Sequence, residues 1–378
     1  MRKKLYAVAE RGHRDSRRTF WSRALPIRKS DRKKLPVTLK DVALRTEVHM
    51  STVSRALNPR TRHLVAKDVT DKILQVAEEL GYRLNLNASG LRSRHSMTIG
   101  VILPDVAQAV FPETILAIET VLAARGYSLL VAHAETDYPR HRLIVEQLAS
   151  HLIDGLIMTT ARRHDPVIEY CIENDLPMVT IHRHEPNFPS VVNDDRQSTR
   201  LAVEHLLSLG HRRIAHVAGP PSADTGRLRR AGFVEALERA GLEPAAIEHS
   251  LRYTREEGSR CASAVFEKAP DLTAIVTASD ALAIGCLDYM ARHGIDCPGD
   301  VSITGHNNAP LVDAIDPPLT TVAIDLPGLG ARAAELMLRR IDNPGAPPEQ
   351  IVLEPRLIVR MSTISLHGKR GKGFGHAP

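Results

Sequence analysis

The segment Val37–Asn58, with the sequence VTLKDVALRTEVHMSTVSRALN, constrains the fold of this chain more than any other segment does. In each half of the segment, apolar residues recur at the spacing of one helical face. These residues are Leu39, Val42 and Ala43 in the first half, and Val53, Ala56 and Leu57 in the second half. The segment therefore predicts two short helices that pack together across a turn.

The second predicted helix has a polar outer face, formed by Met50, Ser51, Thr52, Ser54 and Arg55. An arginine can make two hydrogen bonds to O6 and N7 of guanine, and short hydroxyl groups can reach phosphates. Such a helix fits the major groove of DNA. Periodicity alone fits a purely structural helical hairpin equally well, so both interpretations stay open at this point.

The segment resembles the headpiece of the LacI/GalR family of bacterial transcription regulators, whose pattern is VTxxDVAxxxxVxxxTVSRxLN. The matching residues are Val37, Thr38, Asp41, Val42, Ala43, Val48, Thr52, Val53, Ser54, Arg55, Leu57 and Asn58. The resemblance implies a helix-turn-helix domain that binds a double-stranded DNA operator. It places DNA contacts at Thr38, Met50, Ser51, Thr52, Ser54, Arg55 and Asn58.

A third amphipathic segment, residues 73–80, ends at Gly81, a residue type that is common at helix C-termini. Family members then have a hinge of the form YxPNxxAxxL, and this chain reads YRLNLNASGL. The resemblance implies a hinge helix over residues 85–92 that contacts the operator through Asn85, Ala88 and Leu91. Leu91 would insert into the minor groove and kink the duplex.

Four residues depart from the family pattern. Glu47 replaces the small residue of the turn, and His49 replaces the serine that caps the second helix, a role that histidine fills poorly. Leu84 replaces the hinge proline, and Gly90 inside the hinge helix costs about 1 kcal/mol relative to alanine. These changes leave the predicted fold in place and predict an unusual operator preference or a softer hinge.

Charge is distributed unevenly along the 378 residues. Residues 1–35 contain 13 Lys or Arg and 3 Asp or Glu, residues 36–95 contain 10 and 6, and the remainder contains 27 and 35. The positive excess therefore lies at the DNA-binding end, where it would steer encounter with a polyanion and make affinity fall with salt.

Residues 1–35 lack the apolar run of a secretory signal, and no later segment is long and apolar enough to span a bilayer. We therefore expect no membrane partner and a cytoplasmic, nucleoid-associated protein. Because family members begin near the position of Val37, residues 1–35 are either a disordered, DNA-contacting arm or an extension from a wrongly chosen start codon. Residues 364–378 are expected to form a flexible basic tail.

From Thr98 onward, apolar runs alternate with helical segments in two successive series. The first series includes TIGVILPD, GYSLLVAH, DGLIMTT and PMVTIHR, and the second includes HRRIAHVAG, LTAIVTAS and VSITGHNN. This alternation predicts parallel sheets covered by helices on both faces. Ligands of such sheets bind beyond the carboxyl ends of the strands, so two series predict a cleft between two halves.

Residues 98–363 resemble the family's periplasmic-binding-protein-like (type I) effector domain. Matching residues are Pro104-Asp105, Gly126-Tyr127-Ser128, Asp154-Gly155-Leu156-Ile157, residues 202–219, Arg229, Gly232-Phe233, Ser279-Asp280, Asp300-Val301-Ser302 and Pro317–Val322. The expected fold class is therefore α plus α/β. A headpiece and hinge at 36–95 precede an effector-binding and dimerisation domain at 97–363. Its N-lobe would span 98–193 and 323–350, and its C-lobe 194–322 and 351–363.

The resemblance implies that a small-molecule effector contacts Asp105, Phe111, His182, Arg183, Arg229, Ser279, Asp280 and Asn307. His182 stands where relatives commonly have an acidic residue, and residues 305–308 read GHNN where they have G[FY]DD. The loss of carboxylates beside Arg183 and Arg229 predicts an anionic effector, such as a sugar acid or a phosphorylated sugar.

A structural role is the alternative for each of these effector-site residues. His182 and His306 could be ordinary half-buried histidines. Asp280 could be a helix N-terminal charge, and Arg229 could be a surface ion-pair partner.

No cofactor, metal or catalytic activity is expected. Cys171, Cys261, Cys286 and Cys297 lack the spacing of metal ligands, and the chain has no GxSxG, GxxxxGK[ST] or HExxH motif. A transport binding protein would need an export signal and would have no headpiece. A DNA-binding architectural regulator with a non-functional pocket stays open. Twofold pairing of headpieces on a near-palindromic operator predicts a homodimer.

Overall fold

The computed structural model describes residues 37–58, 61–82, 96–104, 108–134, 138–150, 153–159, 165–183 and 188–367. The chain divides into two compact units, Met1–Asn85 and Leu86–Pro378. The N-terminal arm, the hinge with Asn85, Ala88 and Leu91, the effector candidate Asp105 and most of the C-terminal tail lie outside the described residues. None of the helices in the described ranges combines the length and the apolar character that crossing a bilayer requires.

The first unit is a small helical domain. Its elements are α1 (Leu39–Thr46), α2 (Met50–Leu57), a short 3-10 helix η1 (Arg62–Leu64) and α3 (Lys67–Leu80). The two predicted apolar faces meet α3 in one core, formed by Val42, Ala43, Val53, Ala56, Ile73 and Ala77. The structure confirms the expected pair of helices and the third amphipathic helix. Gly81 ends α3 in the left-handed conformation, with φ 67°.

The turn between α1 and α2 contains the two residues that depart from the family pattern. Glu47 ends α1 with φ 58°, a left-handed conformation that favours glycine. The expectation that His49 would cap α2 poorly is not met, because its Nδ1 accepts a hydrogen bond from the backbone N–H of Ser51 at 3.2 Å. An unprotonated imidazole nitrogen is an acceptor, so it can replace a serine oxygen at this position.

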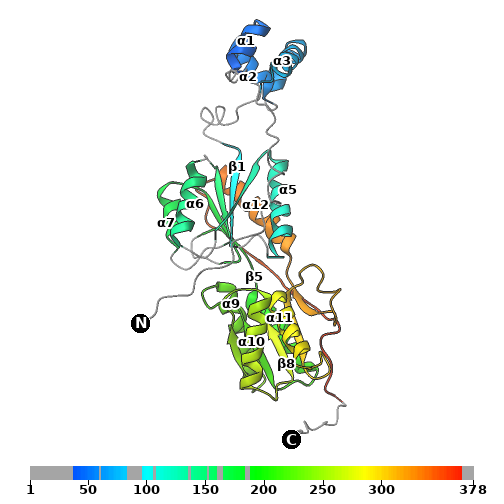
Figure 1. The fold of residues 1–378 in the computed structure, drawn as a ribbon. Coiled ribbons are helices and arrows are strands. Elements are labelled where there is room, and N and C mark those ends of the chain that lie inside the picture. Colours follow the sequence, from blue (N-terminus) through cyan, green and yellow to red (C-terminus); the bar gives the residue numbers. More distant parts are fainter. Residues whose placement is uncertain are drawn as a thin grey trace, which may run out of the picture. The chain divides into compact units, whose positions relative to one another are not determined.

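The second unit contains two sheets, each covered by helices. The first sheet has the strand order β11-β5-β4-β3-β1-β2. The strands are β1 (Thr98–Leu103), β2 (Ser128–His133), β3 (Gly155–Met158), β4 (Met178–Ile181), β5 (Ser190–Asn193) and β11 (Gln350–Leu353). Helices α5 (Phe111–Ala124) and α12 (Leu326–Asp342) cover one face (Figure 1). Helices α6 (Tyr138–Ser150) and α7 (Pro166–Glu173) cover the other. We call this part the first lobe.

The second lobe has the strand order β12-β10-β9-β8-β6-β7. The strands are β6 (Ile214–Ala218), β7 (Ile247–His249), β8 (Ala274–Thr277), β9 (Ser302–Asn307), β10 (Thr320–Ala323) and β12 (Arg356–Ile358). All the pairs in this sheet are parallel except that of β12 with β10. Helices α8 (Asp195–Ser208) and α9 (Asp224–Arg239) cover one face, and α10 (Arg255–Lys268) and α11 (Asp280–Arg292) cover the other.

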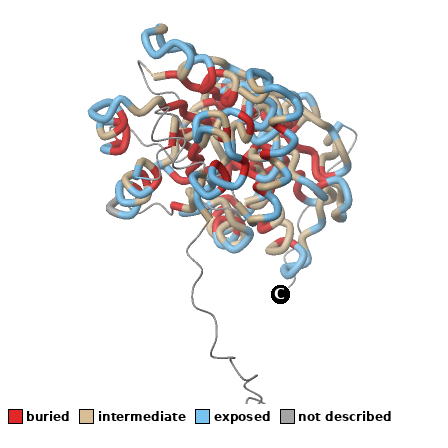
Figure 2. Tube along the Cα trace, turned by 90° about the horizontal axis from the view of Figure 1, so that it is seen from above, coloured by how far each residue is buried: buried red, intermediate tan, exposed pale blue. Residues whose placement is uncertain are grey.

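These two lobes confirm the expected doubly wound fold. Buried segments lie toward the inside of the Cα trace and exposed ones toward its outside (Figure 2). Along the covering helices, buried positions recur among less buried ones because one side of each helix packs on the sheet. Helix α8 approaches α9 so closely at Gly232 that a Cβ there would lie 2.3 Å from the carbonyl oxygen of Arg196. Only glycine fits this crossing, which accounts for the Gly232-Phe233 pair that the sequence singled out.

The chain passes between the lobes after β5, β10 and β11. The third passage lies later than expected. Residues 351–353 were assigned to the second lobe, but Ile351, Val352 and Leu353 pair in parallel with β5 of the first sheet. At the second passage, Ala323 pairs with Asn307 and so belongs to the second sheet. Both observed lobe boundaries lie later in the chain than predicted, because β10 and β11 stay paired with their own sheets up to these residues.

Candidate functional site

The packing of the inner face of α2 determines which of its residues form the outer face. Val53 and Ala56 are fully buried against α1 and α3, which fixes the rotation of the helix. Met50, Ser51 and Arg55 are then exposed, and Thr52, Ser54 and Asn58 are half-buried. The guanidinium of Arg55 forms no ion pair with any carboxylate of the described residues. The predicted contacts on α2 thus share one surface that a polyanion can approach.

Thr38 and Asn58 take part in the ends of the two helices. The backbone N–H and the hydroxyl of Thr38 both donate to Oδ2 of Asp41, each at 2.7 Å. Asn58 ends α2, and its carbonyl accepts from the N–H groups of Thr61 and Arg62. Both residues therefore stabilise the headpiece, and their predicted DNA contacts stay predictions.

A cavity of about 600 Å³ lies at the carboxyl ends of the strands in the second unit. Its wall includes residues of the first lobe: Pro104, Gln108, Val110, Phe111, His133, Thr159, His182 and Arg183. The second lobe contributes Pro220, Ser222, Ala223, Asp224, Thr225, Arg229, Leu251, Arg252, Tyr253, Thr254, Ser279 and Asn307. Six of the predicted effector contacts are among these wall residues: Phe111, His182, Arg183, Arg229, Ser279 and Asn307.

Arg229 projects from α9 and is held by two buried contacts. Its Nε donates to Oδ1 of Asp195 at 2.7 Å, and its Nη1 donates to the carbonyl of Ala278 at 2.6 Å. Burial opposes the charge of Arg229, but Asp195, together with Tyr253 and Asp280, outweighs this effect, so the pKa of Arg229 lies above its ordinary value. The alternative of a surface ion pair is wrong, because Arg229 and Asp195 are only 4% and 3% exposed.

Arg183 follows β4 in the first lobe, and its partner belongs to the second lobe. Its Nε lies 3.3 Å from Oδ2 of Asp224, the first residue of α9. Arg227, one turn along α9, contacts the same carboxylate. The expectation that Arg183 and Arg229 lack nearby carboxylates is therefore wrong. Asp224 and Asp195 take the place of the acidic residues that the sequence pattern omits.

Two histidines lie at the strand ends near Arg229. Burial, reinforced by Arg229, lowers the pKa of His182 to about 4, and the same causes hold the pKa of His306 well below its usual value. Within the described residues, neither Nε2 atom has a hydrogen-bond partner. Both rings are neutral near pH 7. His182 lines the cavity with φ 63°, whereas His306 lies behind the wall and contacts Oδ1 of Asn307 at 2.8 Å.

Asp280, at the start of α11, is not among the wall residues. Its carboxylate accepts from the hydroxyl of Thr321 at 2.6 Å and from the N–H of Ala309 at 2.7 Å. Burial raises the pKa of Asp280 to about 6 against the effect of these hydrogen bonds. The preceding Ser279 caps α11 and also lines the cavity. The carboxylate of Asp280 is thus engaged within the fold, which favours the structural alternative at this position.

Sequence reasoning missed several wall residues, including Asp224, Arg252 and Tyr253. Tyr253 follows β7, and its hydroxyl lies 2.9 Å from Oγ1 of Thr225. The rule that ligand-facing residues follow strand ends could have found the β7 loop, but β7 has only three residues and gives a weak sequence signal. Among the described residues, no three His, Cys, Asp or Glu side chains are grouped so as to hold a metal ion.

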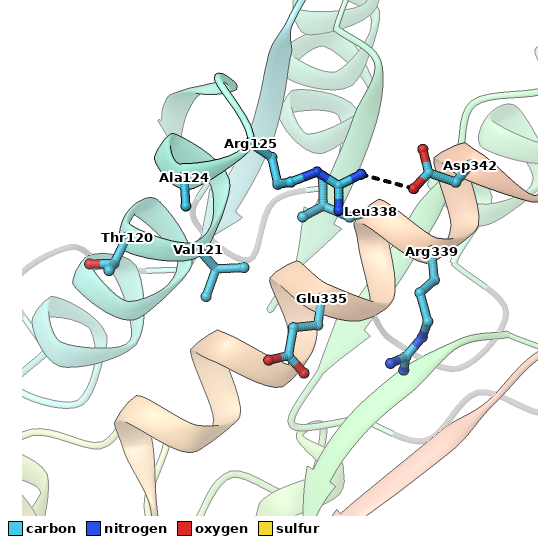
Figure 3. Close-up of a pocket in the computed structure, with 8 residues that line it drawn as sticks. All are labelled: Thr120, Val121, Ala124, Arg125, Glu335, Leu338, Arg339 and Asp342. Atoms are coloured by element: carbon cyan, nitrogen blue, oxygen red, sulfur yellow. Dashed lines mark hydrogen bonds and ion pairs between the residues drawn. The ribbon is translucent and has the colours of Figure 1, made fainter.

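A second hollow, of about 520 Å³, lies between α5 and α12 (Figure 3). Thr120, Val121 and Ala124 face it from α5, and α12 contributes Glu335, Leu338, Arg339 and Asp342. Arg125 pairs with Asp342 at 3.1 Å, and Arg339 pairs with Glu349 at 2.9 Å. Because its charges are already paired, this hollow offers no group that selects a ligand.

Two family models match the chain. The model described as bacterial regulatory proteins, lacI family, matches residues 38–85, and the model described as a periplasmic binding protein-like domain matches residues 203–363. The ribose operon repressor of Halalkalibacterium halodurans is 31% identical over 327 residues, which cover 86% of this chain and 97% of that protein. The HTH-type transcriptional repressor CytR of Escherichia coli K12 is 31% identical over 344 residues, which cover 89% and 99%.

Solved structures show a similar fold. A Lac repressor dimer bound to operator and the anti-inducer ONPF matches with a TM-score of 0.80 and 27% identity, covering 88% of this chain and 100% of that chain. A LacI family transcriptional regulator from Enterococcus faecium with bound ribose matches with a TM-score of 0.64 and 28% identity, covering 71% and 99%.

Proposed function

This chain belongs to the lacI family of bacterial regulatory proteins and is a DNA-binding transcriptional regulator, and we propose that a carbohydrate acid bound in its cavity controls its binding to an operator. The observation that carries the proposal is a cavity whose wall combines three arginines and one carboxylate with neutral hydrogen-bonding groups from both lobes. The protein would act as a repressor in the bacterial cytoplasm, at the nucleoid.

The exposed face of α2 supports the DNA contacts that we assign to this regulator. Arg55 would read a guanine in the major groove, while Ser51 and Ser54 would reach base edges and phosphates. The hinge residues Asn85, Ala88 and Leu91 are proposed to contact the minor groove. One headpiece covers a half-site, so we propose a homodimer on a near-palindromic operator. The similar Lac repressor structure is a dimer bound to operator.

A carbohydrate effector fits the composition of the cavity wall. Phe111 and Tyr253 offer aromatic surfaces, and Ser279, Asn307 and Thr254 offer hydrogen-bonding groups for hydroxyls. Similar regulators were solved with ribose and with cellobiose. An acidic sugar is favoured over a neutral one because Arg252 lines the cavity without an ion pair to any carboxylate of the described residues, and a ligand carboxylate can accept charge-assisted hydrogen bonds from such a group.

Control of DNA binding would follow from the position of the cavity between the lobes. An effector that contacts both lobes favours one arrangement of them, and an equilibrium shifts only by the difference in affinity for the two arrangements. The hinge segment, which precedes β1 of the first lobe, would transmit this shift to the headpieces.

A DNA-binding architectural regulator with a non-functional pocket is the second candidate. The observation in its favour is that two of the three arginines of the wall, Arg183 and Arg229, already have carboxylate partners, Asp224 and Asp195. Such a protein would bind its operator with the same affinity whether or not a small molecule is present.

One experiment tests the proposal and separates the two candidates. Genomic fragments bound by the full chain would first be selected to define the operator. The affinity for that operator would then be measured with and without D-gluconate, D-glucose 6-phosphate, D-glucose and D-ribose. We expect an acidic sugar to change the affinity at least about fivefold. An affinity that no carbohydrate changes would favour the architectural candidate, and an absence of any preferred fragment would contradict both.

A further inference from the structure

We propose that the anionic group of the effector binds at the N-terminus of α9, between Arg183 of the first lobe and Arg252 of the second lobe. This inference rests on the proposed function, because it places one group of the proposed carbohydrate acid within the cavity. It also moves the anion away from Arg229, the arginine that the sequence pattern singled out.

The N-terminus of α9 opens into the cavity. Ser222, Ala223, Asp224 and Thr225 all line the wall, and Ala223 at the N-cap position has no side-chain oxygen to accept from the first N–H groups of the helix. Unpaired N–H groups and the positive end of the helix dipole both favour an anion at such a place. A phosphate or a carboxylate could supply the oxygens that these N–H groups lack.

The charges around this helix end sum to a positive excess. Asp224 lies between Arg183 and Arg227, so this group of three has one more positive than negative charge. Arg252 lines the same cavity from the loop after β7 and forms no ion pair with any carboxylate of the described residues. The excess persists although the carboxylate of Asp224 stands at the helix end, because two guanidinium groups face that one carboxylate.

Arg229 is a weaker binding partner for an anion than this helix end is. Its Nε and Nη1 are engaged by Asp195 and by the carbonyl of Ala278, and this pair is electrically balanced. Positive potential in the cavity is therefore concentrated toward Arg252 and the N-terminus of α9, where Arg183 and Arg227 lie. In a partly desolvated cleft, such a local excess attracts an anion more strongly than a balanced pair does.

Other residues of the wall are neutral, and one of them carries an unsatisfied group. The buried Nε2 of His182 has no hydrogen-bond partner within the described residues, although the ring lines the cavity. Because a buried polar atom is stabilised by a partner, this nitrogen favours a ligand hydroxyl beside it. Ser279 and Asn307 line the same cavity. These neutral groups and the positive charge near the N-terminus of α9 together fit a molecule with one anionic group and a chain or ring of hydroxyls.

Calorimetry on the full chain tests this placement with three probes: D-gluconate, D-glucose 6-phosphate and D-glucose. We expect at least one anionic probe to bind about tenfold more tightly than D-glucose, and the tighter of the two identifies a carboxylate or a phosphate as the preferred group. Arg252→Gln should weaken the anionic probe about tenfold and leave D-glucose unchanged. Arg292→Gln, an exposed arginine on α11 outside the cavity wall, is the matched control and should change neither.

A second variant is expected to act in the opposite direction. Asp224→Asn removes the carboxylate that occupies Arg183 and Arg227, so the anionic probe should bind about threefold or more tightly. General damage to the fold would weaken binding in both variants, and thermal unfolding of each variant would reveal it. A gain in one variant and a loss in the other therefore identifies the charge effect.

Three results would overturn the placement. They are unchanged binding of the anionic probe by Arg252→Gln, weaker binding by Asp224→Asn in a folded protein, and a wild-type chain that binds neither anionic probe. Operator affinity measured on the same preparations separates the two levels of inference. If a carbohydrate acid still changes operator affinity, only the placement fails, whereas the loss of any such response removes the proposed effector class as well.

Discussion

The imidazole of His216 stacks on the ring of Phe233, with centroids 4.7 Å apart and planes inclined by 17°. His216 lies on β6, an inner strand of the second sheet, and is fully buried, and Phe233 belongs to α9. Nδ1 of His216 donates to the carbonyl of Val276 at 2.8 Å. The ring thus joins α9 to the sheet as a neutral group, and it links the stability of the second lobe to pH.

We predict that acidification from pH 7 to pH 5 destabilises this protein. Burial lowers the pKa of His216 to about 4, as it does for His182, and lowers that of His306 as well. Each of these histidines binds protons more readily when unfolded, and His216 and His182 each cost about 2 kcal/mol over this interval. Asp280, whose pKa burial raises to about 6, acts oppositely and returns about 1 kcal/mol, and burial also raises the pKa of Asp195, which acts in the same direction as Asp280. We expect the three histidines to outweigh these two carboxylates.

Denaturant unfolding at the two pH values measures this effect. His216→Gln should reduce the difference in the free energy of unfolding between pH 7 and pH 5 by about 2 kcal/mol, whatever its effect at pH 7. His63→Gln, at an exposed position of the headpiece, is the control and should leave the difference unchanged. A protein that is equally stable at both pH values would contradict the assignment of neutral buried histidines.

Removal of Asp195 should strongly destabilise the second lobe. Asp195→Ala leaves the buried guanidinium of Arg229 without its partner, and breaking a buried pair in this way costs about 3 to 5 kcal/mol. Asp271→Ala breaks the pair with Arg213, in which both side chains are at least half exposed, and should cost less than about 1 kcal/mol. Equal losses in the two variants, measured by denaturant unfolding, would show that the Arg229 pair is more hydrated than the structure indicates.

The headpiece could be predicted from the sequence because its determinants are local. The helical spacing of Val42, Val53 and Ala56 directly gives the face that is buried, and Gly81 marks the end of α3. The alternation of strands and helices likewise predicted both sheets and the position of the cavity at the strand ends. These features depend on periodicity and on the rules of parallel sheets, which operate over short stretches of chain.

The pairing of charges in the cavity could not be predicted in this way. Arg183 meets Asp224 and Arg229 meets Asp195 only after the chain has folded, and no spacing rule connects them. The position of Asp280 after a strand could be predicted from the sequence, but the direction of its carboxylate could not. The carboxylate accepts a hydrogen bond from Thr321. Side-chain direction at a strand end depends on the neighbouring loops, so it became visible only in the structure.

The turn of the headpiece should become more stable when Glu47 is replaced by glycine. Glu47 has φ 58°, and relief of the left-handed strain on a residue with a Cβ is worth about 1 kcal/mol. Glu78→Gly makes the same change within α3 and should instead cost about 1 kcal/mol, because glycine weakens a helix. Hydrogen exchange of the α1 and α3 amides in the full chain would measure both. Faster exchange in Glu47→Gly would mean that the carboxylate makes a contact that outweighs the strain.

Base recognition should depend on Arg55 more than on its neighbour Ser54. Arg55 is exposed on the outer face of α2 and has no ion-pair partner among the described residues, so its guanidinium can reach a guanine edge. Arg55→Ala should cost about 1 to 3 kcal/mol of operator affinity and relax the preference at one base pair. Ser54 is half-buried beside it, and Ser54→Ala should weaken all sequences evenly, as loss of a phosphate contact does. Binding to a panel of single-base operator variants distinguishes the two effects. If Arg55→Ala kept both affinity and base preference, α2 would have to enter the groove by another face.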